Sequence, residues 1–204
     1  MSEAPDRPSP LRGPKQAQVH AEQEAAHAGL KPRLVLVGDS LAKMWQEREL
    51  EPLGLAPMAK LAVSGDSTQH VLWRALDSGV DASEAEVTIL LAGTNNLSEG
   101  AAPEAIAAGL FAIDDELKRR APKARRLILH IPPRVARGDY HEADRDRLNA
   151  LISEAAAPRG FIAVPPPAGM NPADHGLYKD GLHLFRRAYA LLTDEVRRRL
   201  DAAR

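Results

Sequence analysis

The chain has 204 residues, of which 44% are hydrophobic and 27% are charged, so it is long enough to bury one sizeable core and fits one domain better than two. Its 27 basic residues nearly cancel its 28 acidic ones, and the formal net charge of -1 implies no broad attraction to nucleic acid or to an anionic membrane. The lack of cysteine excludes disulfides, thiolate nucleophiles and cysteine metal sites, so the chemistry must use oxygen and nitrogen groups.

The N-terminal segment differs in composition from the rest of the chain. Residues 1–14 are rich in proline and charge, which predicts a disordered tail. They also lack the pattern of a secretory signal. Residues 15–30 are rich in Ala, Gln and Glu, which predicts a helix ending near Gly29. No apolar run approaches the roughly 20 residues that span a bilayer. We therefore expect a soluble, cytoplasmic protein without a membrane span, with residues 15–204 forming a single domain.

Strand and helix signals alternate along the remaining chain. The run Leu34-Val35-Leu36-Val37 is typical of a parallel strand covered on both faces. Similar runs predict strands over 33–37, 58–63, 86–92, 126–131 and 161–164, and the intervening segments predict helices over 68–76, 103–120, 144–156 and 184–200. This alternation predicts a doubly wound α/β fold of the flavodoxin-like type, with a five-stranded parallel sheet in three α/β/α layers.

Four short blocks stand where ligands bind in such a fold. Gly38-Asp39-Ser40-Leu41, Ser64-Gly65-Asp66 and Gly93-Thr94-Asn95-Asn96 each follow a predicted strand. A fourth block, Asp180-Gly181-Leu182-His183, lies between the fifth strand and the last helix. Ligands of open α/β sheets bind beyond the carboxyl ends of the strands, so we expect the four blocks to converge at one edge of the sheet.

Together the blocks supply the groups that ester cleavage requires. Ser40 is the candidate nucleophile, His183 the base that takes its proton, and Asp180 the carboxylate that orients the imidazole. Backbone N–H groups of Ser40 and Gly65 and the side-chain amide of Asn95 are the candidate oxyanion donors. Any one block would more often be a helix cap or a turn, and the ordered set of four favours catalysis.

At these residues the chain resembles the SGNH subgroup of the GDSL hydrolases. The subgroup is named for a serine, a glycine, an asparagine and a histidine, which match Ser40, Gly65, Asn95 and His183, and Asp180 holds the Asp-x-x-His position. The resemblance runs from about residue 34 to residue 190. Residues 65–74 and 93–96 look like the catalytic subunits of the platelet-activating-factor acetylhydrolase branch, although Ser64 replaces a glycine usual there.

The resemblance implies an esterase that needs no metal or cofactor and prefers short acyl groups such as acetyl. It also implies a small-molecule ester as substrate and a homodimer as the assembly. Two alternatives stay open: the same acyl-enzyme could be transferred to another alcohol, and the fold could serve a non-catalytic binding or scaffold protein. The alcohol part of the substrate does not follow from the residues.

Other noticeable residues have simpler interpretations. Asp39 is expected to be structural, bonding nearby backbone, and Trp45 and Trp73 to lie in the core or a pocket wall. The triplet Arg137-Gly138-Asp139 matches an adhesion-receptor motif, but three residues match by chance too easily to carry weight. The remaining histidines show no metal-ligand spacing: His20, His27, His70, His130, His141 and His175.

Overall fold

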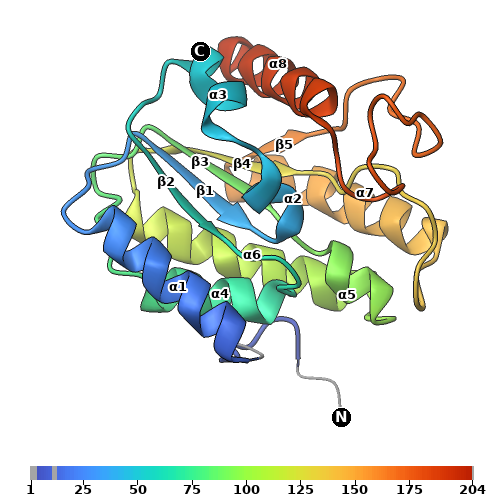
Figure 1. Cartoon of the computed structure of the whole chain (residues 1–204), viewed down its shortest axis with the longest axis horizontal. Helices are drawn as coiled ribbons and strands as arrows, with labels where there is room; N and C mark the ends of the chain where they lie inside the picture. Colours follow the sequence, from blue (N-terminus) through green and yellow to red (C-terminus); the bar gives the residue numbers. More distant parts are fainter. Residues whose placement is uncertain (1–3, 11–12, 204) are drawn as a thin grey trace.

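The computed structural model of the chain describes residues 4–10 and 13–203, in which strands and helices alternate (Figure 1). The strands are β1 (Leu34–Gly38), β2 (Met58–Ala62), β3 (Val87–Leu91), β4 (Arg125–Leu129) and β5 (Ile162–Val164). The longer helices are α1 (Pro14–His27), α4 (Thr68–Asp77), α6 (Pro103–Arg120), α7 (Glu142–Arg159) and α8 (Arg186–Ala202). The short ones are α2 (Ser40–Met44), α3 (Glu47–Leu50), a 3₁₀ turn (Glu51–Leu53) and α5 (Thr94–Ser98).

The five strands form one parallel sheet in the order β2-β1-β3-β4-β5. Gly38 at the end of β1 pairs with Ala62 on one side and with Leu91 on the other. The carboxyl ends of β2, β1 and β3 are therefore neighbours, one strand spacing apart. The predicted five-stranded parallel sheet is confirmed.

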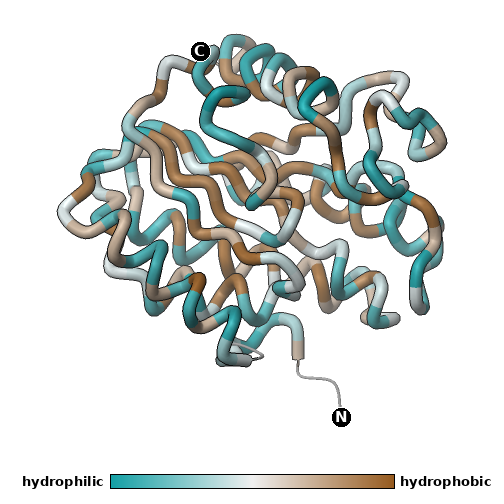
Figure 2. Tube along the Cα trace, viewed as in Figure 1, coloured by the Kyte–Doolittle hydropathy of each residue, from teal (hydrophilic) through white to brown (hydrophobic). Residues whose placement is uncertain are grey.

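Helices cover both faces of the sheet and make three layers (Figure 1). One face packs against α4, α6 and α7, with a core that includes Val35, Val37, Val71, Leu90, Ile106, Leu110, Ile113, Ile128 and Leu148. The other face packs against α2, α3 and α8, with a core that includes Leu34, Leu36, Leu41, Trp45, Ile89, Leu127, Tyr189, Leu192 and Val196. Figure 2 shows the hydrophobic residues along the central strands and the hydrophilic ones on the outer helices. Burial on both faces explains the apolar run of β1, whose five residues are all buried.

Helix α1 covers the open edge of the sheet, where β2 has no neighbouring strand. The side-chain amide of Gln23 donates to the carbonyl of Ala62 at 2.8 Å, and the backbone N–H of Lys60 donates to His27 Nε2 at 3.3 Å. These bonds satisfy backbone groups that an edge strand otherwise exposes for pairing with another chain. The N-terminal helix thus closes the edge of the sheet that lies nearest to the second block.

Residues 4–10 form hydrogen bonds with the folded part of the chain. Thr68 Oγ1 donates to the carbonyl of Pro5 at 2.9 Å, and the N–H of Ser9 donates to the carbonyl of Gln69 at 3.1 Å. Residues 4–10 therefore contact the start of α4. The rest of the predicted disordered tail includes residues 1–3 and 11–12, which lie outside the described residues, so the predicted domain boundary at residue 14 stays a prediction.

Several element bounds differ from those predicted. α8 starts at Arg186 rather than at residue 184, because Leu184 still pairs with Tyr178 in an isolated β-bridge. α7 is longer than predicted and ends at Arg159, followed by Gly160 as the C-cap, whose φ of 69° suits that position. None of the described helices has the length and apolar character that crossing a bilayer requires.

Candidate active site

The first block is positioned by the close packing of β1 on β3. A Cβ at Gly38 would lie 2.0 Å from the carbonyl oxygen of Leu91, so no other residue fits at this position without moving a strand. The N–H of Asp39 donates to the same carbonyl at 3.2 Å. Asp39 is the N-cap of α2 and accepts the N–H of Leu41 at 2.9 Å, as expected of a structural residue. Ser40 therefore opens α2 directly at the edge of the sheet.

The structure brings Ser40, His183 and Asp180 into one hydrogen-bonded series. His183 Nε2 lies 3.1 Å from Ser40 Oγ, and His183 Nδ1 lies 2.8 Å from Asp180 Oδ2. Ser40 is buried, whereas the His183 and Asp180 side chains are 26% and 35% exposed. The imidazole thus faces a buried hydroxyl on one side and a carboxylate on the other, while substrate and water can reach it.

Contacts between α8 and α2 hold these distant segments together. The hydroxyl of Tyr189 donates to the carbonyl of Leu41 at 2.8 Å, and Trp45 Nε1 donates to Thr193 Oγ1 at 3.1 Å. Both bonds are buried. Because α8 follows the His183 loop and α2 begins at Ser40, docking these two helices sets the distance between His183 and Ser40.

Hydrogen bonds keep Asp180 ionised. Partial burial raises the pKa of Asp180, but bonds from the His183 side chain and from the backbone N–H groups of His183 and Leu182 outweigh it. The two backbone bonds, at 2.8 and 3.1 Å, end on Oδ1 and leave Oδ2 for the imidazole. The pKa therefore lies well below its usual range, and a carboxylate faces His183 Nδ1 at neutral pH.

The candidate oxyanion donors lie at the neighbouring strand ends. Gly65 follows β2 and is exposed, and Asn95 is in α5 after β3, so they flank Ser40 in the strand order. The Asn95 amide donates to the carbonyl of Asp66 at 2.7 Å, which fixes its orientation and leaves its second N–H for another acceptor. A buried pair between Asp66 and Arg74, with bonds of 2.8 and 3.1 Å, anchors this loop on α4.

Asp39 is a buried acid next to Ser40. Burial raises the pKa of Asp39 to about 7, against the bond from Leu41 and the nearby charge of Arg134, which lower it. The folded protein therefore holds this proton up to a higher pH than the unfolded chain does.

The stability of the protein is expected to depend on pH through Asp39. As pH rises from about 4 to 7, the unfolded chain loses this proton and the folded protein keeps it, so the free energy of unfolding falls. Asp39→Asn keeps an acceptor for the N–H of Leu41 and removes the ionisation. The free energy of unfolding of the variant and of the wild type would be measured by urea denaturation at pH 4.5 and at pH 7.5. The difference between them, variant minus wild type, should be about 1–3 kcal/mol larger at pH 7.5 than at pH 4.5. An equal difference at both pH values would contradict this result.

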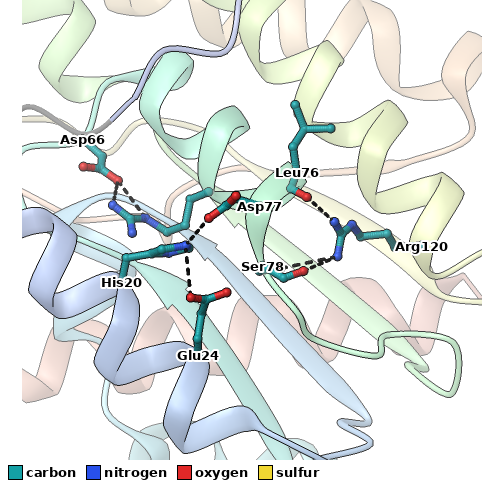
Figure 3. Close-up of polar contacts among 8 residues, drawn as sticks. His20, Glu24, Asp66, Leu76, Asp77, Ser78 and Arg120 are labelled. Atoms are coloured by element: carbon teal, nitrogen blue, oxygen red, sulfur yellow. Dashed lines mark hydrogen bonds and ion pairs between the residues drawn. The ribbon is translucent and has the colours of Figure 1, made fainter.

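One group of side chains within residues 4–10 and 13–203 has the types and spacing of metal ligands: His20 and Glu24 of α1 with Asp77 of α4 (Figure 3). His20 Nε2 lies 3.0 Å from Asp77 Oδ2 and 3.9 Å from Glu24 Oε2, and its ring centroid lies 5.0 Å from that of Trp73, with the ring planes tilted by 56°. A metal-bound histidine usually donates its other nitrogen to an acceptor, but His20 Nδ1 is buried without a described partner. These contacts therefore fit the docking of α1 on α4 better than a metal site.

Comparison with known proteins identifies the family of this chain. The GDSL-like lipase/acylhydrolase family matches residues 36–191, and the chain belongs to this family. It is a carboxylic ester hydrolase. The chain is 30% identical over 168 residues to "Platelet-activating factor acetylhydrolase IB subunit alpha1" of Pongo abelii, with 78% of this chain and 71% of the relative covered. Over 124 residues it is 29% identical to the alpha2 subunit of Rattus norvegicus, with 60% of this chain and 53% of that protein covered.

Solved structures share the fold. A GDSL-like lipase from Bacteroides thetaiotaomicron aligns with a TM-score of 0.72 at 19% identity, covering 92% of this chain and 98% of the other. A lipase/acylhydrolase from Enterococcus faecalis aligns with a TM-score of 0.66 at 18% identity, covering 83% and 95%. These similarities support the three-layer α/β/α architecture.

Proposed function

We propose that this hydrolase cleaves short-acyl, acetyl-type esters through an acyl-enzyme formed on Ser40. The observation that carries the proposal is the series Ser40–His183–Asp180, with 3.1 Å and 2.8 Å between successive polar atoms. A serine hydroxyl needs a base within hydrogen-bond reach, and the base needs a partner that fixes its tautomer. Both conditions are met at the edge of the sheet where ligands of this fold class bind.

The proposed reaction has two halves. His183 Nε2 takes the proton of Ser40 Oγ as this oxygen attacks the ester carbonyl, and Asp180 stabilises the imidazolium. The N–H groups of Ser40 and Gly65 and the second N–H of the Asn95 amide bind the oxyanion. The C–O bond then breaks, and the alcohol leaves with the proton from His183. Water attacks the acyl-enzyme by the same route and releases the acid and Ser40.

One feature supports a short acyl group: the relatives at about 30% identity carry the name acetylhydrolase. Because His183 is partly exposed, an alcohol could replace water as the acceptor, and acyl transfer stays the second candidate. Membership of a hydrolase family favours either reaction over the scaffold role.

The test is a series of p-nitrophenyl esters from acetyl to decanoyl, with Ser40→Ala as the blank. We expect Ser40-dependent turnover whose kcat/KM falls at least about tenfold between acetyl and octanoyl, because a site that fits a short acyl group gains no transition-state contacts from the additional methylenes. A kcat/KM that is flat or rises with chain length would contradict the short-acyl preference. Product analysis with added glycerol or a sugar would separate hydrolysis from transfer.

The homodimer and the cytoplasmic location predicted from the sequence stay predictions. Light scattering of the purified chain would decide the first, and fractionation of the source cells the second.

A further inference from the structure

The connection between β4 and α7 crosses both halves of the candidate active site. Its residues 134–139, which we call the strap, first bind α5, the helix that carries Asn95. Arg134 Nη1 donates to the carbonyl of Thr94 at 2.9 Å and to Thr94 Oγ1 at 2.6 Å, and the N–H of Asp139 donates to the carbonyl of Ser98 at 3.0 Å. The strap is thus bonded to both ends of α5, the helix that carries the candidate oxyanion donor Asn95.

The strap also binds the loop that carries Asp180 and His183. The N–H of Val135 donates to the carbonyl of Gly181 at 2.9 Å. Arg137 Nη2 donates to the backbone carbonyl of Asp180 and lies 3.8 Å from Asp180 Oδ2. The guanidinium thus binds the main chain of Asp180 and leaves the 2.8 Å bond between Oδ2 and His183 in place.

Gly138 makes the tight approach to α5 possible. Its φ is +62°, and a Cβ built there would lie 2.4 Å from the carbonyl oxygen of Ser98. A side chain at this position would push the strap away from α5. The triplet Arg137-Gly138-Asp139, which had no explanation at the level of sequence, therefore has an internal role: a side-chain bond to Asp180, a close approach to Ser98 and a backbone bond to Ser98.

We propose that Arg137 is a positioning residue for Asp180, and that the strap sets the Asp180–His183 loop against the oxyanion helix α5. The inference rests on the proposed function of Asp180. The Arg137 and Asp180 side chains are 45% and 35% exposed, so their interaction contributes little to global stability. Its effect is on geometry, because a displacement of about 1 Å in a catalytic constellation can lower the rate roughly a hundredfold.

The kinetic test compares Arg137→Ala, Arg137→Lys and the control Arg187→Ala with the wild type on p-nitrophenyl acetate. Arg187 is exposed near the same loop, so the control removes the same charge without touching Asp180. We expect kcat of Arg137→Ala to fall about tenfold with KM within about twofold, since only positioning is lost. Arg137→Lys should recover part of the loss, because an ammonium can still donate to the carbonyl. Equal kcat in all four proteins would overturn the proposal.

A second readout does not depend on turnover. The proton between His183 Nδ1 and Asp180 should give a low-field ¹H NMR signal in the wild type and in the control. In Arg137→Ala this signal should broaden, and backbone hydrogen exchange of residues 176–186 should become faster. If signal and exchange in Arg137→Ala equal those of the wild type, Arg137 does not position the loop. These measurements decide the proposal even if the wild type shows no Ser40-dependent turnover, a result that would count against the proposed function alone.

Discussion

Replacing His183 with alanine is expected to lower kcat for p-nitrophenyl acetate by about 10⁴- to 10⁶-fold. In the structure His183 Nε2 is the group that reaches Ser40 Oγ, and without it the hydroxyl has no base to take its proton. His183 is partly exposed and sits in a loop, so its removal leaves no large cavity in either core. The Tm of the variant should therefore stay within a few degrees of the wild-type value.

The variant Ser40→Ala and the double variant Ser40→Ala/His183→Ala test whether the two residues act in the same step. If Ser40 and His183 act as one unit, Ser40→Ala should lose about as much activity as His183→Ala, and the double variant little more than either. Losses that multiply in the double variant would show that the two residues act independently. A His183→Ala variant that keeps more than about one hundredth of the wild-type kcat would rule out His183 as the base.

The central strands could be predicted from the sequence because they are buried on both faces. In β1, Leu34 to Gly38 are all buried, and the resulting apolar run is visible without a structure. The short helices α2, α3 and α5 have four or five residues, too few for a helical period to show. The start of α8 was predicted two residues too early, because apolar Leu184 continues the pattern although its backbone pairs with Tyr178.

The candidate site could be predicted where it depends on strand order. Ser40, Gly65 and Asn95 each follow a strand, and these three strands are neighbours in the sheet. Their places after predicted parallel strands were therefore enough to predict that they lie at one edge of the sheet. Contacts between loops could not be predicted in this way. Arg137 meets Asp180 across 43 residues with no periodic signal, since the contact depends on the backbone of Gly138 and on bonds to Ser98. Sequence reasoning therefore named the candidate site residues but not the contact of Arg137 with Asp180.

Asp180→Asn is expected to lower kcat by roughly 10³- to 10⁴-fold with little change in KM. The variant keeps an Oδ1 acceptor for the backbone N–H groups of Leu182 and His183, so the turn should be retained. At the position of Oδ2, however, the amide presents N–H groups to His183 Nδ1 and favours the tautomer that carries its proton on Nε2. That tautomer cannot accept the proton of Ser40.

The dependence of wild-type activity on pH also tests the proposed role of Asp180 as the partner of His183. Because hydrogen bonds hold the pKa of Asp180 well below its usual range, the carboxylate stays ionised in mild acid, and its protonation should not limit activity there. A loss of activity on the acid side would then have a source other than Asp180. Kinetics of Asp180→Asn at several pH values, with the low-field proton signal as a structural check, test this order of roles. If the signal is gone but kcat has fallen less than about tenfold, Asp180 does not orient the base, and the exposed imidazole of His183 must select its productive tautomer unaided.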